Sequence, residues 1–286
     1  METLRRLAVL GLFMLLASTA RAEDAGLFLF AEDTPAPTVT ALPAPAVTVT
    51  PESGFFLEVV REEQESGSEK RDFRVLIYHT HTYEAYTATE SMPYTPTEKW
   101  RTANSERNMV AVGAYLTELL QSAGMEVVHD VTAFEPPQLS SAYERSLGML
   151  KARQEAGERF DLYIDLHRDA YSKNNGPNTV EKDGADLARL LILVGKGTGQ
   201  TGAGYAEKPN WEQNRAIAQA ISNRLNLQCE DLCRGVALKS GRYNQHVADC
   251  CVLIEVGNNY NTLEEALAAM PYLANAICAL ADGQIQ

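Results

Sequence analysis

Hydrophobic and polar positions alternate along the chain in blocks that predict strands and helices in turn. Short continuous apolar runs predict buried strands, and apolar residues spaced three and four apart predict helices. By this pattern we expect strands at 73–78, 125–128, 160–166, 187–194, 235–238 and 251–256, and helices at 106–122, 139–157 and 211–225. A last helix is expected after Thr262, which caps it together with Glu265 at the third following position.

The succession of strands and helices over residues 71–286 predicts an α/β fold with a mostly parallel central sheet flanked by helices. In such sheets, ligands bind beyond the carboxyl ends of the strands. The polar residues that end or follow the expected strands are therefore the first place to look for a functional site.

The first 70 residues follow a different pattern. Residues 1–22 combine Arg5 and Arg6, an apolar run of eleven residues from Leu7 to Ala17, and the sequence Ala-Arg-Ala, which together are typical of a secretory signal peptide. An uncleaved membrane anchor is the alternative, although the apolar run is short for a span. Residues 23–70 are rich in Pro, Ala and Thr and then in charged residues, which predicts a linker. We expect an extracytoplasmic protein, either secreted or held at the membrane only through its N-terminus.

The net charge of the chain bears on its binding partners, and its cysteine content bears on disulfides and structural zinc. The chain has 25 Lys and Arg against 38 Asp and Glu, a formal net charge of −13, which repels phosphate backbones, so nucleic acid is not expected as a partner. Five Cys in an exported protein leave at least one that is unpaired or paired between chains. Cys229 and Cys233 could close a small loop, but the cysteines lack the paired spacing of a structural zinc site.

Three clusters of polar residues lie at the ends of expected strands. The sequence HTHTYE at 79–84 follows the first strand, HRD at 167–169 follows the third, and Glu255 lies near the end of the last. Two histidines and a carboxylate from separate elements, with a spare glutamate, form the minimal set of a hydrolytic zinc site. The spare carboxylate would carry a proton from water to the leaving amine.

Composition and spacing leave several assignments open. His79 and His81 lie two residues apart on a segment expected to be extended, so they would point the same way and one or both could bind a metal. Glu106 at the expected start of a helix also suits the helix dipole, and Glu84 has the same ambiguity. His246 is equally consistent with a structural role and with substrate contact.

The strings RVLIYHTHTYEAY, IDLHRDA, RYNQH and LIEVGNNYNTLEEA resemble the stage II sporulation protein P family, which comprises secreted peptidoglycan hydrolases of endospore-forming bacteria. The resemblance covers about 71–286. That family is similar in turn to the zinc-dependent N-acetylmuramoyl-L-alanine amidases. The resemblance therefore implies an amidase-like zinc hydrolase fold, zinc as cofactor and peptidoglycan as substrate.

Motif by motif, the resemblance to the amidases implies His81, Glu106 and His167 as zinc ligands and Glu255 as the general base. His79 stands where the amidases have a proline, and it competes with His81 for the role of first ligand.

The chain departs from the amidase pattern at positions that bear on substrate and metal. The glycines that follow the first ligand in the amidases are absent, and Glu84 stands there as a competing ligand or a substrate contact. Arg168 is expected to act in catalysis, by clamping a substrate carboxylate or holding the tetrahedral intermediate, unless it pairs with a neighbouring aspartate. Asn244 and His246 of RYNQH are further candidate substrate contacts.

The resemblance implies hydrolysis of the amide between N-acetylmuramic acid and L-alanine, in the septal wall that is thinned during engulfment of the forespore. It also implies endopeptidase cleavage of stem-peptide cross-links and a partner, stage II sporulation protein D, which is a lytic transglycosylase. The alternative from another class is a non-catalytic peptidoglycan-binding or septal scaffold protein. A second enzymatic alternative is a zinc carboxypeptidase or endopeptidase that acts on peptide alone.

Overall fold

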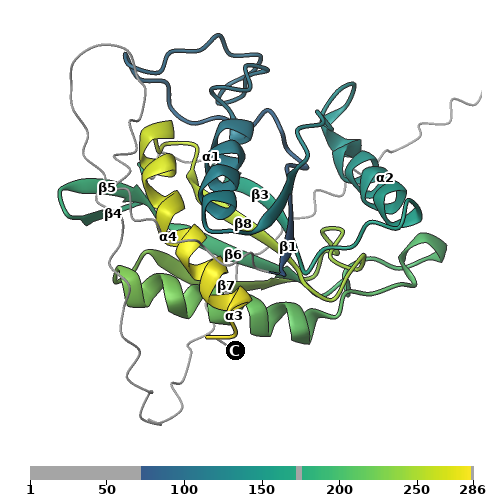
Figure 1. Cartoon of the computed structure of the whole chain (residues 1–286). Helices are drawn as coiled ribbons and strands as arrows, with labels where there is room; N and C mark the ends of the chain where they lie inside the picture. The colour runs from purple at the N-terminus through teal and green to yellow at the C-terminus, as the bar shows by residue number, and fades with distance from the viewer. Residues whose placement is uncertain (1–71, 172–175, 285–286) are drawn as a thin grey trace, which may run out of the picture. The chain divides into compact units, whose positions relative to one another are not determined.

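A six-stranded sheet forms the centre of the computed structural model, which describes residues 72–171 and 176–284 (Figure 1). The strands follow one another across the sheet in the order β2-β1-β3-β8-β6-β7. Their bounds are β1 (Arg74–Tyr78), β2 (Glu126–His129), β3 (Leu162–Asp169), β6 (Leu190–Gly195), β7 (Cys233–Lys239) and β8 (Cys251–Asn258). The pairs among β2, β1, β3 and β8 are parallel, and β6 runs antiparallel to β8. The sheet is therefore mostly parallel, which confirms the predicted fold class.

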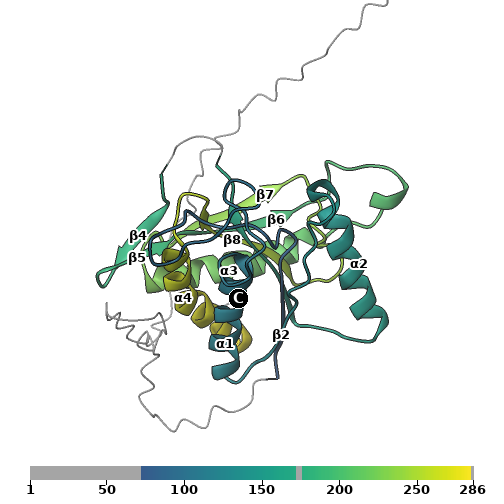
Figure 2. The same cartoon turned by 90° about the horizontal axis from the view of Figure 1, so that it is seen from above.

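Helices cover both faces of the sheet, and alternation along the strands assigns each residue to a face. The helices are α1 (Met109–Ser122), α2 (Ala142–Glu155), α3 (Trp211–Gln228) and α4 (Leu263–Ala281). Val75 and Ile77 of β1 pack into the large core formed with α1, α3 and α4, whereas Leu76 and Tyr78 pack with Leu150 of α2. Figures 1 and 2 show α2 apart from α1, α3 and α4, as these two separate cores require.

The same alternation decides which polar residues of the central strands face α2. In β3, Ile164 and Leu166 belong to the large core, so Asp165 and His167 face the other side. In β8, Ile254 and Val256 belong to the large core, which leaves Glu255 facing the α2 side. β3 and β8 pair in parallel with His167 directly opposite Glu255, so the two side chains lie next to each other on one face.

Most of the expected elements are present, and their exact ends decide where candidate residues lie. α4 begins after Thr262 with the predicted capping box, in which the Thr262 hydroxyl and the Glu265 carboxylate each satisfy a backbone N–H. The first helix begins at Met109, three residues later than predicted, because the Asn108 side chain accepts a hydrogen bond from the Val110 N–H and caps it. Residue 106 therefore lies outside the helix. His167 lies within β3, which continues to Asp169, and does not follow the strand as the apolar run predicts.

The predicted strand over 187–194 is confirmed only in its second part, because the chain there divides into two strands. β5 (Ala185–Ala188) pairs with β4 (Thr179–Lys182) in a separate antiparallel hairpin, and β6 begins after Arg189. The hairpin turns at Asp183 and Gly184, both of which have positive φ, as a two-residue turn of type I′ requires. Short 3₁₀ helices at Leu139–Ser141 and Ala203–Tyr205 complete the fold, and β7 forms the edge strand that the sequence predicts near 235–238.

The predicted signal or anchor segment at 1–22 and the linker at 23–70 lie outside the described residues. Within the described residues, no helix is both long and apolar enough to cross a membrane. Cys229 and Cys233 carry free thiols, so the loop closure that their spacing allows is not present in the structure.

Candidate active site

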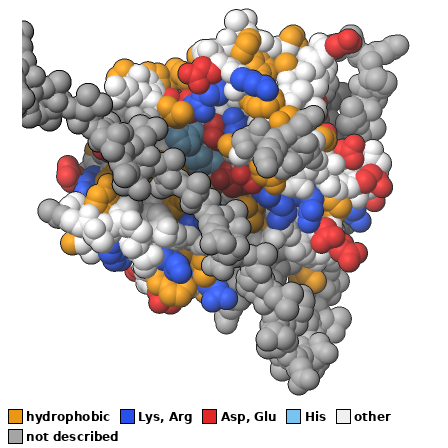
Figure 3. Space-filling view, turned by 180° about the vertical axis from the view of Figure 1, so that it is seen from behind, with side chains coloured by type: hydrophobic (Ala, Val, Ile, Leu, Met, Phe, Trp, Pro, Cys, Tyr) orange, Lys and Arg blue, Asp and Glu red, His pale blue; other side chains and the backbone are white. Residues whose placement is uncertain are grey.

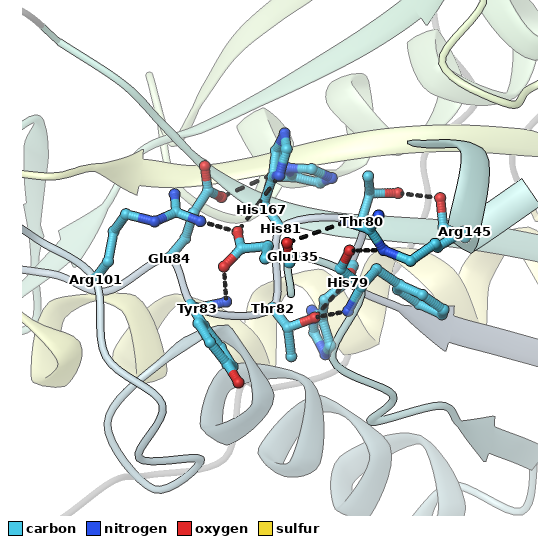
Figure 4. Close-up of polar contacts among 12 residues, drawn as sticks. His79, Thr80, His81, Thr82, Tyr83, Glu84, Arg101, Glu135, Arg145 and His167 are labelled. Carbon is cyan, nitrogen blue, oxygen red and sulfur yellow. Dashed lines mark hydrogen bonds and ion pairs between the residues drawn. The ribbon is translucent and has the colours of Figure 1, made fainter. Parts of the chain in front are cut away.

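His81 and His167 come together where β1 and β3 end (Figure 4). Their ring centroids are 5.3 Å apart and the rings are nearly perpendicular, at 87°. His167 is buried within β3, whereas His81 lies in the turn after β1 and keeps 22% of its side chain exposed. The structure thus brings together the two histidines that the family resemblance implies as ligands.

Glu84 is the carboxylate that accompanies these histidines. Its Oε2 lies 3.5 Å from His167 Nδ1 and accepts a hydrogen bond from the backbone N–H of Arg168 at 3.2 Å. Burial acts to raise the pKa of Glu84, but the Arg168 guanidinium and His167 outweigh it and lower that pKa to about 2. Glu84 is therefore a charged, buried carboxylate against a histidine ring.

Glu106, which the resemblance implies as the second ligand, is not brought to this cluster. It is an exposed residue of the turn before α1, and its backbone N–H donates to Asn104 Oδ1 at 3.0 Å. The reason is the late start of α1 at its Asn108 cap. Of the two carboxylates that the sequence leaves open, the structure places Glu84 at the histidines.

His79 and His81 do not point the same way, contrary to the expectation for an extended segment. The chain turns after His79, and the His79 ring is buried on the side of α1. Its Nδ1 lies 2.9 Å from the carbonyl oxygen of Leu166 and its Nε2 lies 2.8 Å from Nε2 of His129. Burial, followed by His129, lowers the pKa of His79 to about 3. With both ring nitrogens engaged there, His79 does not fit the role of a ligand beside His81.

Glu255 lies beside His167 on the neighbouring strand, as the register of β3 and β8 requires. Its Oε2 is buried and has no hydrogen-bond partner among the described residues. Burial raises the pKa of Glu255, and the charges of Glu84 and Asp169 add to that effect against His167. A carboxyl whose pKa is raised in this way can both accept and release a proton near neutral pH.

Arg168 is committed to the protein's own backbone. Its Nε donates to the carbonyl of Ala85 at 3.0 Å and its Nη2 to that of Trp100 at 3.1 Å, while Nη1 lies 3.7 Å from Glu84 Oε1. Only 5% of the residue is exposed. The pairing of β3 with β8 is irregular between His167 and Asp169, and such a bulge redirects the side chain of the residue within it. Arg168 therefore holds Glu84 and the segment that follows Glu84 in place. This geometry does not provide the predicted catalytic contact between Arg168 and substrate.

Asp165 fixes the other side of the His167 ring. Its Oδ1 lies 2.8 Å from His167 Nε2, and it accepts hydrogen bonds from the N–H and hydroxyl of Thr80 at 2.8 and 2.7 Å. Burial acts to lower the pKa of His167, but Asp165 and Glu84 outweigh it and raise that pKa above its usual range. His167 is thus held between two carboxylates.

Asn244 and His246 lie in the loop before β8, and the structure assigns Asn244 a structural role. Asn244 has a left-handed backbone (φ 55°), and its Nδ2 donates to the carbonyl of Tyr143 at 2.8 Å and to Ser146 Oγ at 3.0 Å, which fastens the loop to α2. His246 is buried, and burial followed by neighbouring positive charges lowers its pKa to about 4. Its Nδ1 has no hydrogen-bond partner within the described residues.

Glu135 and Arg101 are site residues that sequence reasoning missed. Glu135 is buried, its Oε1 lies 3.4 Å from His81 Nδ1, and the same oxygen forms an ion pair with Arg101 Nη2. A signal for Glu135 existed, because it follows β2 at the same edge of the sheet as the other polar clusters. It stands several residues beyond the strand, before two prolines, where an acidic residue looks like part of an ordinary loop.

His81, His167 and Glu84 fit zinc in chemical type, since two imidazoles and a carboxylate are a common catalytic donor set. Glu255 Oε2 is also buried here with no hydrogen-bond partner among the described residues. Figure 3 shows histidine and acidic surface side by side in a recess of the rear face. Over the described ranges, however, no three His, Cys, Asp or Glu side chains are close enough to hold a metal ion. The three donors are of the right chemical type for zinc and lie near one another, but their side chains do not converge on one point.

Comparison with known sequences places the chain in a family. The sequence profile described as Stage II sporulation protein P matches residues 49–278, a range that includes every residue of the cluster. The chain belongs to the Stage II sporulation protein P family. Stage II sporulation protein P of Bacillus subtilis (strain 168) is 27% identical over 204 residues, which are 67% of this chain and 47% of that protein. The chain therefore spans about half the length of this family member.

Solved structures resemble this Stage II sporulation protein P family chain only distantly. The catalytic domain of the CD27L endolysin targeting Clostridia difficile is 14% identical, with a TM-score of 0.45 over 74% of this chain and 97% of that one. The CwlD amidase from Clostridioides difficile, solved in complex with the GerS lipoprotein, is 11% identical, with a TM-score of 0.46 over 74% and 98% of the two chains. At these values the likeness bears on neither the chemistry nor the ligand of the site.

Proposed function

We propose that this chain is a zinc-dependent peptidoglycan hydrolase that cleaves the amide bond between N-acetylmuramic acid and L-alanine. The observation that carries the proposal is the placement of Glu255, whose carboxyl has a buried Oε2 and a raised pKa, beside the cluster of His81, His167 and Glu84. Membership of the Stage II sporulation protein P family supports the biological setting, which is thinning of the septal wall during engulfment. The motif resemblance to the amidases supports the choice of bond.

His81, His167 and Glu84 are the residues that would hold the metal. The chemistry that zinc supplies when bound is Lewis-acid polarisation of the scissile carbonyl and a lowered pKa for water. Asp165 Oδ1 lies 2.8 Å from His167 Nε2 and would fix the ring, which leaves Nδ1, 3.5 Å from Glu84 Oε2, as the nitrogen that would face the metal. Arg168 fixes Glu84 in turn, through the backbone N–H and the guanidinium.

Glu255 is the proton carrier in this proposal. It takes a proton from the water that attacks the amide carbon, and it gives a proton to the amine nitrogen as the carbon–nitrogen bond breaks. The products are a lactyl carboxylate on the glycan and a stem peptide with a free L-alanine amine. A raised pKa suits Glu255 to both steps, because a proton carrier works best when its pKa is near the working pH.

The cellular context belongs to the same proposal. The signal pattern at 1–22 supports an extracytoplasmic location, with the protein secreted or attached through its N-terminus. The family resemblance alone supports a working partner like stage II sporulation protein D, and it alone supports additional cleavage of stem-peptide cross-links.

The test is mass spectrometry of purified peptidoglycan after incubation with the 286-residue chain and zinc, beside the Glu255→Gln variant. We expect free stem peptides from the unaltered chain and a loss of rate of about 10²–10⁴-fold in the variant, the usual contribution of a general acid–base group. Shortened stems without free stem peptide would point to a peptidase. Unchanged peptidoglycan that nevertheless binds the protein would contradict the proposal and favour the scaffold alternative.

A second pair of variants tests the carboxylate ligand. Glu84→Gln removes the charge beside His167, whereas Glu106→Gln changes an exposed residue outside the cluster. We expect the first to lose zinc-dependent hydrolysis and the second to keep it. The opposite result would restore Glu106 as the ligand.

A further inference from the structure

We propose that Glu135 is a positioning residue that sets the ring orientation and tautomer of His81, and that Arg101 keeps Glu135 in place. The inference rests on the proposed function in taking His81 as a metal ligand. The pairing of Glu135 with the His81 ring does not depend on the metal, because it follows from the distance between their side chains.

The pairing is visible in the atoms that face each other. His81 Nδ1 and Glu135 Oε1 are both buried, neither has a well-formed hydrogen bond, and they lie 3.4 Å apart. A neutral imidazole has one N–H and one lone pair, and a carboxylate can only accept. Glu135 therefore favours the proton of His81 on Nδ1, which leaves the Nε2 lone pair available to a metal.

Glu135 is itself held from several sides, as Figure 4 shows. Its Oε2 accepts a hydrogen bond from the N–H of Tyr83 at 3.1 Å, and its Oε1 forms an ion pair with Arg101. Its backbone carbonyl accepts from Arg145 Nη2 at 3.0 Å. A residue fixed in this way can impose an orientation on the partly exposed His81 ring.

The two carboxylates near Arg101, those of Glu135 and Glu98, differ in how far they are buried. Only 5% of the Glu135 side chain is exposed, and a buried carboxylate is costly unless charged or polar partners compensate it. Glu98 lies 3.9 Å from Arg101 Nε and its side chain is 73% exposed, with no contact to His81 within the described residues. Glu98→Gln is therefore a matched control, because it removes a carboxylate from Arg101 and leaves the His81 pairing intact.

The experiment compares the 286-residue chain with Glu135→Ala, Glu135→Gln and Glu98→Gln, after circular dichroism has shown which variants fold. The first measurement is the ¹⁵N NMR shifts of the His81 ring nitrogens without metal. We expect the Nδ1–H tautomer in the unaltered chain and in Glu98→Gln, and a shift toward Nε2–H in Glu135→Ala. Glu135→Gln keeps the shape of the side chain, so the comparison uses this variant if Glu135→Ala does not fold.

The second measurement is zinc affinity, by competition with a chromophoric chelator. We expect about 10–100-fold weaker zinc binding in the Glu135 variants, as for other carboxylates that orient a ligating histidine, and no change in Glu98→Gln. Unchanged tautomer and affinity in folded Glu135 variants would overturn the inference. Complete loss of zinc binding in folded Glu135→Gln would also overturn it, by making Glu135 a ligand. An unaltered chain that binds no zinc would overturn the zinc dependence in the proposed function, while the NMR shifts would still decide the role of Glu135.

Discussion

At the scale of single residues, the site consists of buried charges that compensate one another. Glu84 faces Arg168 and His167, and Asp165 faces the other edge of the His167 ring. Each of these groups would be costly to bury alone, and each is held by at least one partner of opposite charge. The removal of one member therefore affects the stability of the fold as well as the chemistry of the site.

Arg168→Lys tests this dependence. A lysine keeps the charge but cannot donate to the carbonyls of both Ala85 and Trp100, which are bonded at 3.0 and 3.1 Å in the structure. We expect the free energy of unfolding in urea to fall by about 1–3 kcal/mol, because a buried carbonyl loses its donor. Arg189→Lys, at a partly exposed residue bonded to the carbonyl of Asp231, should change it by less than about 0.5 kcal/mol. Equal effects of the two substitutions would contradict the role assigned to Arg168.

The pair of His79 and His129 makes stability depend on pH. The carbonyl of Leu166 can only accept, so His79 carries its proton on Nδ1 and its Nε2 accepts from His129. Burial lowers the pKa of His129 from 6.5 to about 4, against a smaller opposite effect of Asp130. For His129 the unfolded chain therefore binds more protons between these two values, so its contribution to stability falls as the pH drops through 6.5 and stops falling near 4. His79, whose pKa burial lowers to about 3, adds a loss of the same sign.

We expect His129 to cost about 1 kcal/mol of stability at pH 5.5 relative to pH 7.5. Urea unfolding at the two pH values measures this cost, and His129→Gln should reduce the difference because its amide can donate to His79 without titrating. The same pH dependence in the variant as in the parent would show that His129 is not responsible.

At the scale of elements, helix α1 packs against His79 and His129 at Gly113. A Cβ atom at Gly113 would lie 2.6 Å from Nε2 of His79 and 2.6 Å from Nε2 of His129, closer than any real contact. The absence of a side chain there lets the helix approach β1 and β2 closely enough to cover the pair. The position of α1 in turn holds the chain that leads from His79 to the site.

Gly113→Ala should therefore destabilise the protein, by about 1–3 kcal/mol, as other overpacked positions do. Gly148 in α2 is the matched control, since a Cβ there meets nothing within 4 Å. Gly148→Ala should raise stability by about 0.5–1 kcal/mol through helix propensity alone. Thermal or urea unfolding of both variants checks the sign, and a stabilised Gly113→Ala would refute the close packing.

At the scale of the whole molecule, the order of strands assembles the site. β1, β3 and β8 are neighbours in the sheet although the segments between them are long, and their carboxyl ends meet at one edge. Because β3 and β8 run parallel and in register, His167 and Glu255 lie side by side. A ligand that ties residues from several of these strands should therefore stabilise the whole fold.

Zinc should raise the thermal unfolding midpoint of the chain if it binds this site. A ligand present at 100 times its Kd adds about 2.7 kcal/mol, which for a domain of this size is about 5–10 °C. Differential scanning fluorimetry with and without zinc measures the shift, and Glu84→Gln should lose it while Glu106→Gln retains it. A shift that survives in Glu84→Gln would show that the metal binds elsewhere.

The sequence by itself determined the alternation of strands and helices, the mostly parallel sheet, the cap of α4 and the prediction that polar residues would meet at the strand ends. Those features follow from local periodicity and from rules for parallel sheets. The strand pattern also pointed to His167 and Glu255 as candidates, because they stand in or next to apolar strands, whereas His81 was preferred to His79 only through the family resemblance.

Only the tertiary structure decided which of the competing residues take part. The turn after His79 directs that ring toward α1, and the cap at Asn108 leaves Glu106 at the surface, so Glu84 takes the place beside His167. Glu135 reaches His81 from a loop that is more than 50 residues away in the chain. These outcomes depend on side-chain directions and on contacts between distant segments, and spacing along the chain contains neither.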